Sequence, residues 1–175
     1  MSRSKKIRRR ESRETSRAEE RLHAPQKSRE SKLLQVEMRL FNTYGRLERR
    51  NVNKYLIKWD EPSRSKIQFE VKHFLKRYWQ SCVVYEEFPV YGTRMKVDIL
   101  NATKKIAVEV NGAQHSNYNK FFHANSRINY LNSIKRDFKK LEWLEQNSYN
   151  LIEINHDEID LLSKEFFKKK FKVIL

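Results

Sequence analysis

The sequence predicts an α/β fold, in which a mixed sheet is flanked by helices and preceded by a basic N-terminal extension. Residues 63–155 alternate helical apolar spacing with short β-branched runs, which is typical of α/β proteins. Residues 1–32 contain few large apolar side chains, whereas the whole chain is 38% hydrophobic, enough to fill a core. We therefore divide the chain into a basic arm, residues 1–60, and a folded domain, residues 61–175.

The charge of the chain favours a polyanion as its partner. The 175 residues include 38 Lys+Arg and 22 Asp+Glu, a formal net charge of +16. We expect double-stranded DNA ahead of an anionic membrane surface. The single cysteine, Cys82, excludes a disulfide framework and a cysteine-based zinc site. Because no apolar run is long enough to span a bilayer and no secretory signal is evident, we expect a cytoplasmic, DNA-associated protein that makes no membrane contact. The sequence leaves the oligomeric state open.

The arm holds 18 Lys+Arg against 8 Asp+Glu. Residues 1–32 cannot offset their ordering entropy by burial, so they form either a solvated tail or an arm that orders along phosphates. The apolar spacing from Leu33 to Phe41 predicts a short helix that ends near Tyr44. Residues 46–60 mix basic and aromatic side chains, which suits a nucleic-acid surface and a docking element equally. The DNA contacts expected here are Arg8, Arg9, Arg10, Arg49, Arg50 and Lys54.

A helix is predicted to begin after Pro62, with Ser63 or Ser65 as its N-cap. Its inward positions recur at helical spacing and are Ile67, Val71, Phe74, Leu75 and Tyr78. By the same spacing, Glu70 lies on the inward side. A carboxylate there either faces a functional site or pairs with a cation at the rim of the core.

Three strands are predicted at residues 82–88, 96–100 and 106–110, with turns between them. Alternation places Asp98 on the face opposite Val97 and Ile99, and it places Glu109 opposite Val108. Two neighbouring antiparallel strands then bring Asp98 and Glu109 together, which is unfavourable unless a cation lies between them. At the end of the first strand, Glu86 and Glu87 are expected to be exposed, with a role for one of them in the site as the alternative.

The rest of the chain predicts a loop from Asn111, a helix from about Ser126 to Gln146, a strand at residues 150–154 and a final helix. The long helix has an inward stripe, flanked by Asp137, that consists of Leu131, Ile134, Phe138, Leu141 and Leu144 or Glu145. The final helix is expected from its apolar residues, Ile159, Leu162, Phe166 and Phe167, and ends in the basic run Lys168-Lys169-Lys170.

This order of elements, with acids on the second and third strands, resembles the PD-(D/E)XK nuclease superfamily. The densest motif is Glu109-Val110-Asn111-Gly112-Ala113-Gln114-His115, and it resembles the very-short-patch-repair endonuclease-like branch. That branch includes phage and intron homing endonucleases with a Glu–Asp–x–His–Asp set. The resemblance covers residues 63–155. It implies an αβββαβ core and a metal-dependent DNA endonuclease of the homing or nicking kind.

The resemblance also implies a set of site residues, which is Glu70, Asp98, Glu109, Gln114, His115 and Asp137. Asp98, Glu109 and Glu70 would hold Mg²⁺ or Mn²⁺, because hard cations prefer carboxylate oxygens. His115 would act as general acid or base or donate to the phosphate, Asp137 would orient it, and Gln114 would bond a phosphate or the attacking water. Further DNA backbone contacts are expected from Lys120, Arg127, Lys135 and Arg136.

One departure from the family pattern keeps two alternatives open. Asn111 stands where this branch usually has aspartate and where the wider superfamily has lysine. An asparagine ligates a metal without contributing charge, so the chain is alternatively a nuclease-fold nucleic-acid-binding protein with weakened chemistry. A third reading is a basic scaffold component of a nucleoprotein particle, for which the arm would suffice. Asp98, Glu109, His115 and Asp137 together favour the endonuclease.

Overall fold

The computed structural model describes residues 36–112 and 127–175, with the backbone alone for residues 127–130. The chain divides into two compact units, Met1–Val36 and Glu37–Leu175. The first lies almost wholly outside the described residues, so the second is described here. Its elements are β1 (Glu37–Phe41), β2 (Leu47–Asn51), the short 3₁₀ helix η1 (Asn53–Tyr55), α3 (Lys66–Trp79), β3 (Val84–Pro89), β4 (Lys96–Asn101), β5 (Ile106–Asn111), α4 (Arg127–Gln146), β6 (Asn150–Asn155), the 3₁₀ helix η2 (His156–Leu161) and α5 (Lys164–Phe171).

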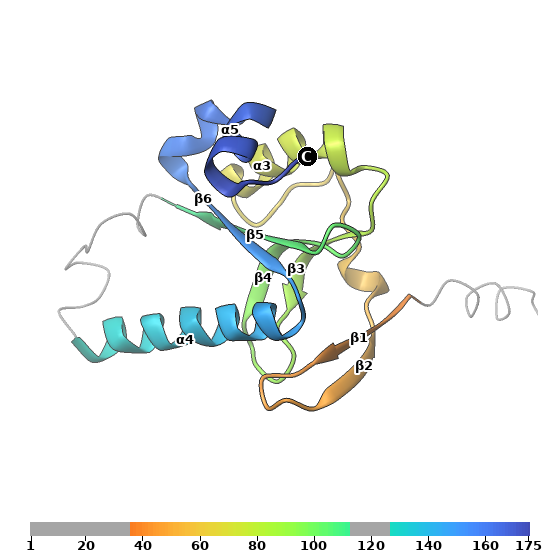
Figure 1. The fold of residues 1–175 in the computed structure, drawn as a ribbon, viewed down its shortest axis with the longest axis vertical. Coiled ribbons are helices and arrows are strands. Elements are labelled where there is room, and N and C mark those ends of the chain that lie inside the picture. The colour runs from red at the N-terminus through yellow and green to blue at the C-terminus, as the bar shows by residue number, and fades with distance from the viewer. Residues whose placement is uncertain (1–35, 113–126) are drawn as a thin grey trace, which may run out of the picture. The chain divides into compact units, whose positions relative to one another are not determined.

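The central sheet is mixed and has the strand order β3-β4-β5-β6. β4 pairs antiparallel with both β3 and β5, whereas β5 and β6 run parallel with Glu109 opposite Glu153. A parallel pair needs a crossover, and α4 lies in the connection between β5 and β6. The α/β class predicted from the sequence is confirmed, with a mixed four-stranded sheet and flanking helices (Figure 1).

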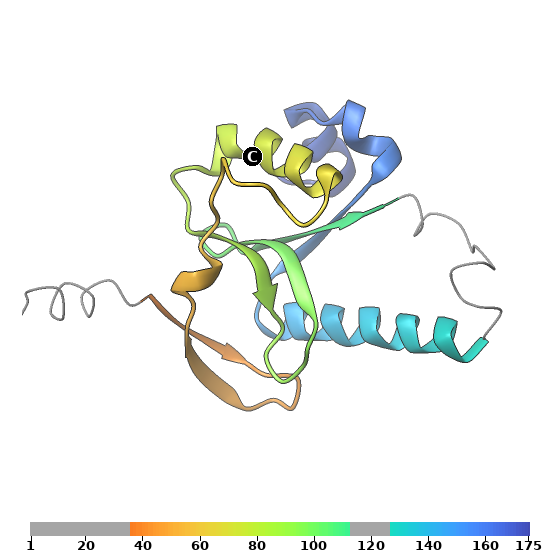
Figure 2. The same cartoon turned by 180° about the vertical axis from the view of Figure 1, so that it is seen from behind.

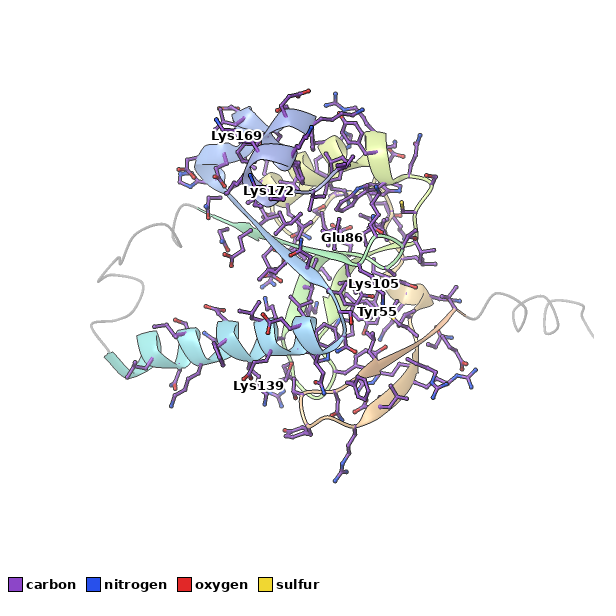
Figure 3. The ribbon with its side chains drawn as sticks, viewed as in Figure 1. Tyr55, Glu86, Lys105, Lys139, Lys169 and Lys172 are labelled. Carbon is purple, nitrogen blue, oxygen red and sulfur yellow. The ribbon has the colours of Figure 1, made fainter. Side chains whose placement is uncertain are left out.

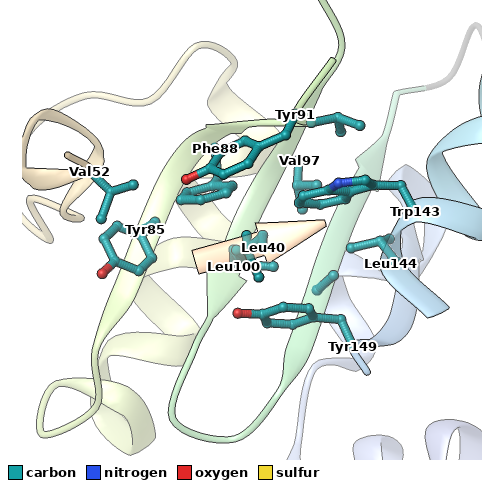
Figure 4. Packing of buried hydrophobic residues seen from close by; sticks show 12 residues of the cluster. Leu40, Val52, Tyr85, Phe88, Tyr91, Val97, Leu100, Trp143, Leu144 and Tyr149 are labelled. Carbon is teal, nitrogen blue, oxygen red and sulfur yellow. The ribbon is translucent and has the colours of Figure 1, made fainter. Parts of the chain in front are cut away.

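Two hydrophobic clusters cover the two faces of this sheet. The first joins Trp143 and Leu144 of α4 to Ala107 of β5 and Leu40 of β1, and Figure 4 shows its aromatic side chains. The second joins α3 and α5 to the other face of β5 through a set that includes Val71, Phe74, Val108 and Phe167. Helices α3 and α5 therefore lie on one side of the sheet, and α4 and the β1–β2 hairpin lie on the other (Figures 1 and 2).

A β-hairpin stands where the sequence predicted a helix ending near Tyr44. β1 and β2 pair antiparallel, with Phe41 opposite Leu47. Asn42 closes the turn, because its Oδ1 accepts hydrogen bonds from the backbone N–H groups of Tyr44 and Arg46, and Gly45 has a φ of +75°. The helix prediction was wrong because apolar residues at 36, 38, 40 and 41 fit both periods. Asn42 and Gly45 were the stronger signal.

The hairpin is fastened to the end of α4. The Trp143 indole Nε1 donates to the Phe41 carbonyl at 2.6 Å. The Asn147 side chain donates to the same carbonyl at 3.1 Å and accepts from the Phe41 N–H at 2.8 Å. Since the hairpin shares the first cluster, the folded unit begins at Glu37, and the predicted boundary between residues 60 and 61 lies too late in the chain.

Helix α4 packs on the sheet through its C-terminal turns. Trp143 and Leu144 are at most 1% exposed, whereas Leu131, Ile134 and Phe138 are 43%, 45% and 60% exposed. The predicted inward stripe is therefore wrong at these three residues and correct at Leu144. Their spacing shows that they share a face of the helix, but it does not say that the sheet is long enough to cover that face. Figure 1 shows the helix continuing past the sheet.

The alternation of side chains between the two faces of the sheet is interrupted once in β3 and once in β4. Tyr85 and Phe88 lie three residues apart and belong to the same cluster, as do Val97 and Leu100. Regular strands would place each pair on opposite faces. Glu87, in the middle of β3, has a φ of +52°. Consequently Val97 and Ile99 belong to different clusters, contrary to the shared face that alternation predicted.

A buried lysine ties the segment before α3 to the core. Lys72 is 0% exposed, and its Nζ contacts the Glu86 carboxylate at 2.9 Å, the Glu61 carbonyl at 2.7 Å and the Lys58 carbonyl at 3.1 Å. Glu86 is thus only 16% exposed at its side chain, and Figure 3 shows it in the interior between α3 and the sheet. The predicted exposure of Glu86 was wrong because the sequence gives no sign that a lysine of α3 is buried beneath it.

Both helices of the α3–α5 layer begin at serine caps. The Ser65 side chain accepts from the Gln68 N–H, and the Ser163 side chain accepts from the Phe166 N–H. The C-terminal region therefore consists of η2 followed by the separate helix α5, where the sequence predicted one helix. In the described residues, no helix combines the length and the apolar composition needed to cross a membrane.

Candidate functional site

An open cleft of about 1600 Å³ lies where strands β3, β4 and β5, the start of α3 and the middle of α4 meet. Its lining within the described part of the chain is rich in charge of both signs. The acids are Glu87, Asp98, Glu109, Asp137 and Glu153, and the cations are Arg64, Arg94, Lys96, Arg136 and Lys140. The basic side chains of such a surface attract a negatively charged ligand, and a cation bound by the acidic side chains would offset their repulsion of that ligand.

Asp98 and Glu109 lie on neighbouring strands at the centre of this lining. The last β4–β5 pair is Ile99 opposite Val108, so the two acids follow directly in the same register. The Asp98 Oδ2 accepts a hydrogen bond from the Val110 N–H at 2.9 Å. The two residues therefore lie side by side on neighbouring strands, and both line the cleft.

Burial changes the acidity of both groups. It raises the pKa of Asp98 above its usual range, opposed by the Val110 N–H and the charge of Lys140. It raises the pKa of Glu109 to about 7, although Lys140 opposes the effect, and the charge of Asp98 adds to it. Carboxylates of perturbed pKa that line one cleft are typical of functional sites.

Lys140 is a site residue that the sequence reasoning missed. Its Nζ lies 2.7 Å from the Glu109 Oε2, and the two side chains are 17% and 15% exposed. The other carboxylate oxygen of Glu109, Oε1, is buried and has no hydrogen-bond partner among the described residues. The available signal was weak, because Lys140 is one of several cations on α4 and is distinguished from them only by its helical spacing from Arg136 and Asp137.

The predicted site residues do not all come together. Asp137 is exposed and lines the cleft with Asp98 and Glu109. Glu70 does not line it: this side chain is 43% exposed and lies 4.0 Å from Lys66 on its own helix. The predicted inward position of Glu70 was wrong, because the buried stripe of α3 runs through Gln68, Val71, Lys72 and Leu75. Gln114 and His115 lie outside the described residues.

Glu87 was expected to be exposed, but its side chain lines the cleft and is 22% exposed. Asn111, which replaces the charged residue of the family pattern, also lines the cleft. Its Nδ2 donates to the Asn155 Oδ1 at 3.3 Å. Asn111 therefore has an amide partner on β6.

The cations predicted to contact DNA differ in whether another side chain already pairs with them. Arg49 is paired with Glu37, and Arg50 is paired with Glu48 and lies over the Tyr91 ring. The others with described side chains are Lys54, which lies over the Tyr55 ring, Lys135, which is exposed, and Arg136, which lines the cleft. Arg8, Arg9, Arg10 and Lys120, and the side chain of Arg127, lie outside the description. Figure 3 shows further cations away from the cleft, including Lys169 and Lys172 at α5.

The described carboxylates fit a divalent cation with an incomplete protein shell. No group of three or more His, Cys, Asp or Glu side chains in residues 36–112 and 127–175 is placed to hold one metal ion. Mg²⁺, however, is commonly held by one or two carboxylates and several waters. Asp98 and Glu109 supply that number, and the unpartnered Oε1 of Glu109 is an oxygen that a cation would satisfy.

No family model matches the chain. No solved structure matches it either. Over 66 residues it is 36% identical to Uncharacterized protein 033L of Invertebrate iridescent virus 3, a stretch that makes up 38% of this chain and 34% of that protein. The matched stretch thus covers about a third of the length of this relative, whose name states no activity.

Proposed function

We propose that this protein is a metal-dependent DNA endonuclease that hydrolyses phosphodiester bonds. The observation that carries the proposal is the Asp98–Glu109 pair: two half-buried carboxylates of raised pKa, one with an unpartnered oxygen, lie in a cleft rimmed by arginines and lysines. The element order α3, β3, β4, β5, α4, β6 is also the αβββαβ order of the superfamily that the sequence resembles.

In this proposal the chain's own residues divide the work of hydrolysis. Asp98 and Glu109 would hold Mg²⁺ or Mn²⁺, which when bound polarises the phosphate and lowers the pKa of a bound water. Lys140, whose Nζ lies 2.7 Å from the Glu109 carboxylate, would donate to a phosphate oxygen. Arg64, Arg94 and Arg136 would contact flanking phosphates.

Duplex DNA is the proposed substrate because of the size and charge of the cleft. The space is open and large, and its cations come from separate elements of the fold. Phosphate contacts of this kind position a nucleic acid without reading its sequence.

A plasmid assay tests the proposal. Supercoiled DNA is incubated with the full chain and Mg²⁺, with and without EDTA, and the relaxed and linear products are measured. Asp98→Asn and Glu109→Gln should each lower cleavage about a hundredfold or more, because each removes a charge that holds the metal. Lys140→Met should lower the single-turnover rate by a similar factor. Glu142→Gln, an exposed change elsewhere on α4, serves as the matched control.

DNA binding is measured in parallel by fluorescence anisotropy with Ca²⁺ in place of Mg²⁺. Binding should survive the carboxylate substitutions, since affinity comes mainly from phosphate contacts. EDTA-resistant cleavage, or cleavage that both carboxylate variants retain, would reject the proposal.

The second candidate is a nuclease-fold protein that binds DNA without cutting it, and Asn111 favours it. The wild-type chain would then bind the plasmid in a salt-dependent manner and leave it supercoiled with Mg²⁺ and with Mn²⁺.

A further inference from the structure

Glu87 occupies an unusual position in the middle of the edge strand β3. Its φ of +52° is a left-handed value that side chains other than glycine rarely adopt within a strand. The pairs on either side of it are Glu86 with Ile99 and Phe88 with Val97, so the residue across from Glu87 is Asp98. The break in alternation described above falls at these two acids.

The contacts of Glu87 are with groups of the cleft. Its carboxylate lies 3.1 Å from the Lys96 Nζ and 3.9 Å from Arg64, and the Gln68 side chain donates to it at 3.5 Å. Glu87 lines the same cleft as Asp98 and Glu109, and the register places it across from Asp98. Glu87 therefore belongs electrostatically to the Asp98–Glu109 pair.

Glu70 shows the opposite properties. It is exposed, is paired with Lys66 of its own helix, and does not line the cleft. Non-glycine residues persist in a left-handed conformation only where their surroundings impose it, and such residues concentrate at functional sites. Glu70 lies in a regular helix, which requires no special surroundings, whereas the contacts around Glu87 hold it in its left-handed conformation.

We infer that Glu87, and not Glu70, is the third acidic residue of the cation site, where it acts on the ion through its charge. The inference rests on the proposed function, because it concerns the same cation. Glu87 acts as a positioning residue: it adds a negative charge beside Asp98 and holds Lys96 and Arg64 next to the carboxylates. Asp98 and Glu109 remain the groups that contact the ion.

Mn²⁺ binding to the full chain without DNA tests this role independently of cleavage. Free Mn²⁺ is measured by electron paramagnetic resonance during titration. Glu87→Gln should weaken binding about tenfold, the effect of one unit charge on a divalent ion several ångströms away in a water-like dielectric. Glu70→Gln is the matched control and should bind as the wild type does.

A second variant separates the charge of Glu87 from a structural role. Lys96→Met breaks the same ion pair but removes a competing positive charge, so it should tighten Mn²⁺ binding. Glu87→Asp keeps the charge and should bind more tightly than Glu87→Gln. If Glu87 were needed only for its ion pair, Lys96→Met and Glu87→Gln would both weaken binding, and the inference would be wrong.

The outcomes also separate this inference from the proposed function. Wild-type affinity in Glu87→Gln together with lost affinity in Asp98→Asn overturns the inference and leaves the proposed function intact. A wild-type chain that binds no Mn²⁺ overturns both. Thermal unfolding of each variant shows whether it folds. If Glu87→Gln does not fold, the Mn²⁺ affinities of Glu87→Asp and Lys96→Met still decide the question.

Discussion

Replacing Glu109 by glutamine is expected to remove a pH dependence from the free energy of unfolding. In the folded chain burial raises the pKa of Glu109 to about 7, from an ordinary value of 4.5. An acid whose folded pKa is raised binds its proton more tightly in the folded state. Its contribution to stability is therefore complete below pH 4.5 and is lost as the pH rises through about 7. At about 1.4 kcal/mol for each pH unit, the total loss is about 3 kcal/mol.

Urea denaturation at several pH values between 4 and about 8, in EDTA, measures this difference. The wild-type free energy of unfolding should fall relative to that of Glu109→Gln by about 3 kcal/mol across the range. The quantity compared is the slope of the free energy of unfolding against pH. Glutamine leaves Lys140 beside a neutral partner and therefore changes the free energy of unfolding at every pH. Added Mg²⁺ should restore wild-type stability above pH 7 and leave Glu109→Gln unchanged, since a ligand stabilises the state that binds it. Parallel curves for the two chains would refute the reasoning about the buried carboxylate.

Three further changes test other parts of the structure. Lys72→Met should lower the free energy of unfolding by about 3–5 kcal/mol because it leaves the Glu86 carboxylate unpaired; urea denaturation measures the loss, and adding Glu86→Gln should recover part of it. Asn147→Ala should cost about 2 kcal/mol and speed hydrogen exchange at the Phe41 amide; unchanged protection there would contradict the docking of the hairpin through Asn147. Deleting residues 1–32 removes 12 Lys+Arg and 5 Asp+Glu. The slope of log DNA affinity against log salt concentration should then become shallower by about 0.9 for each of roughly three to five lost phosphate contacts. An identical slope would leave the arm without a role on DNA.

The sheet was predictable because its pattern is local and strong. The β-branched runs of β4 and β5 each span six residues, and alternation within β5 placed Glu109 on the correct face. The C-terminal end of the long helix, at Gln146, was also predicted correctly. Both signals depend on neighbours in the chain, which a sequence records directly.

The remainder depended on contacts between distant residues. Only a weak local signal, its helical spacing from Arg136 and Asp137, distinguishes Lys140 from the other cations of α4, and its partner Glu109 is remote in sequence. The side of α3 that carries Glu70 was assigned from apolar spacing alone, and the burial of Gln68 and Lys72 moved that stripe. The left-handed backbone of Glu87 contradicts the preference of the residue itself, so no rule of propensity would have found it.

Position 87 places two selective pressures in opposition. A left-handed strand residue favours glycine, and after it asparagine, because neither suffers the clash that a longer side chain meets there. A library saturated at this position and selected only for folding should therefore enrich those two residues. Selection for the proposed activity should retain glutamate or aspartate at the expense of stability. Among diverging relatives, the residue at this one position would then record whether a lineage has kept its chemistry or only its fold.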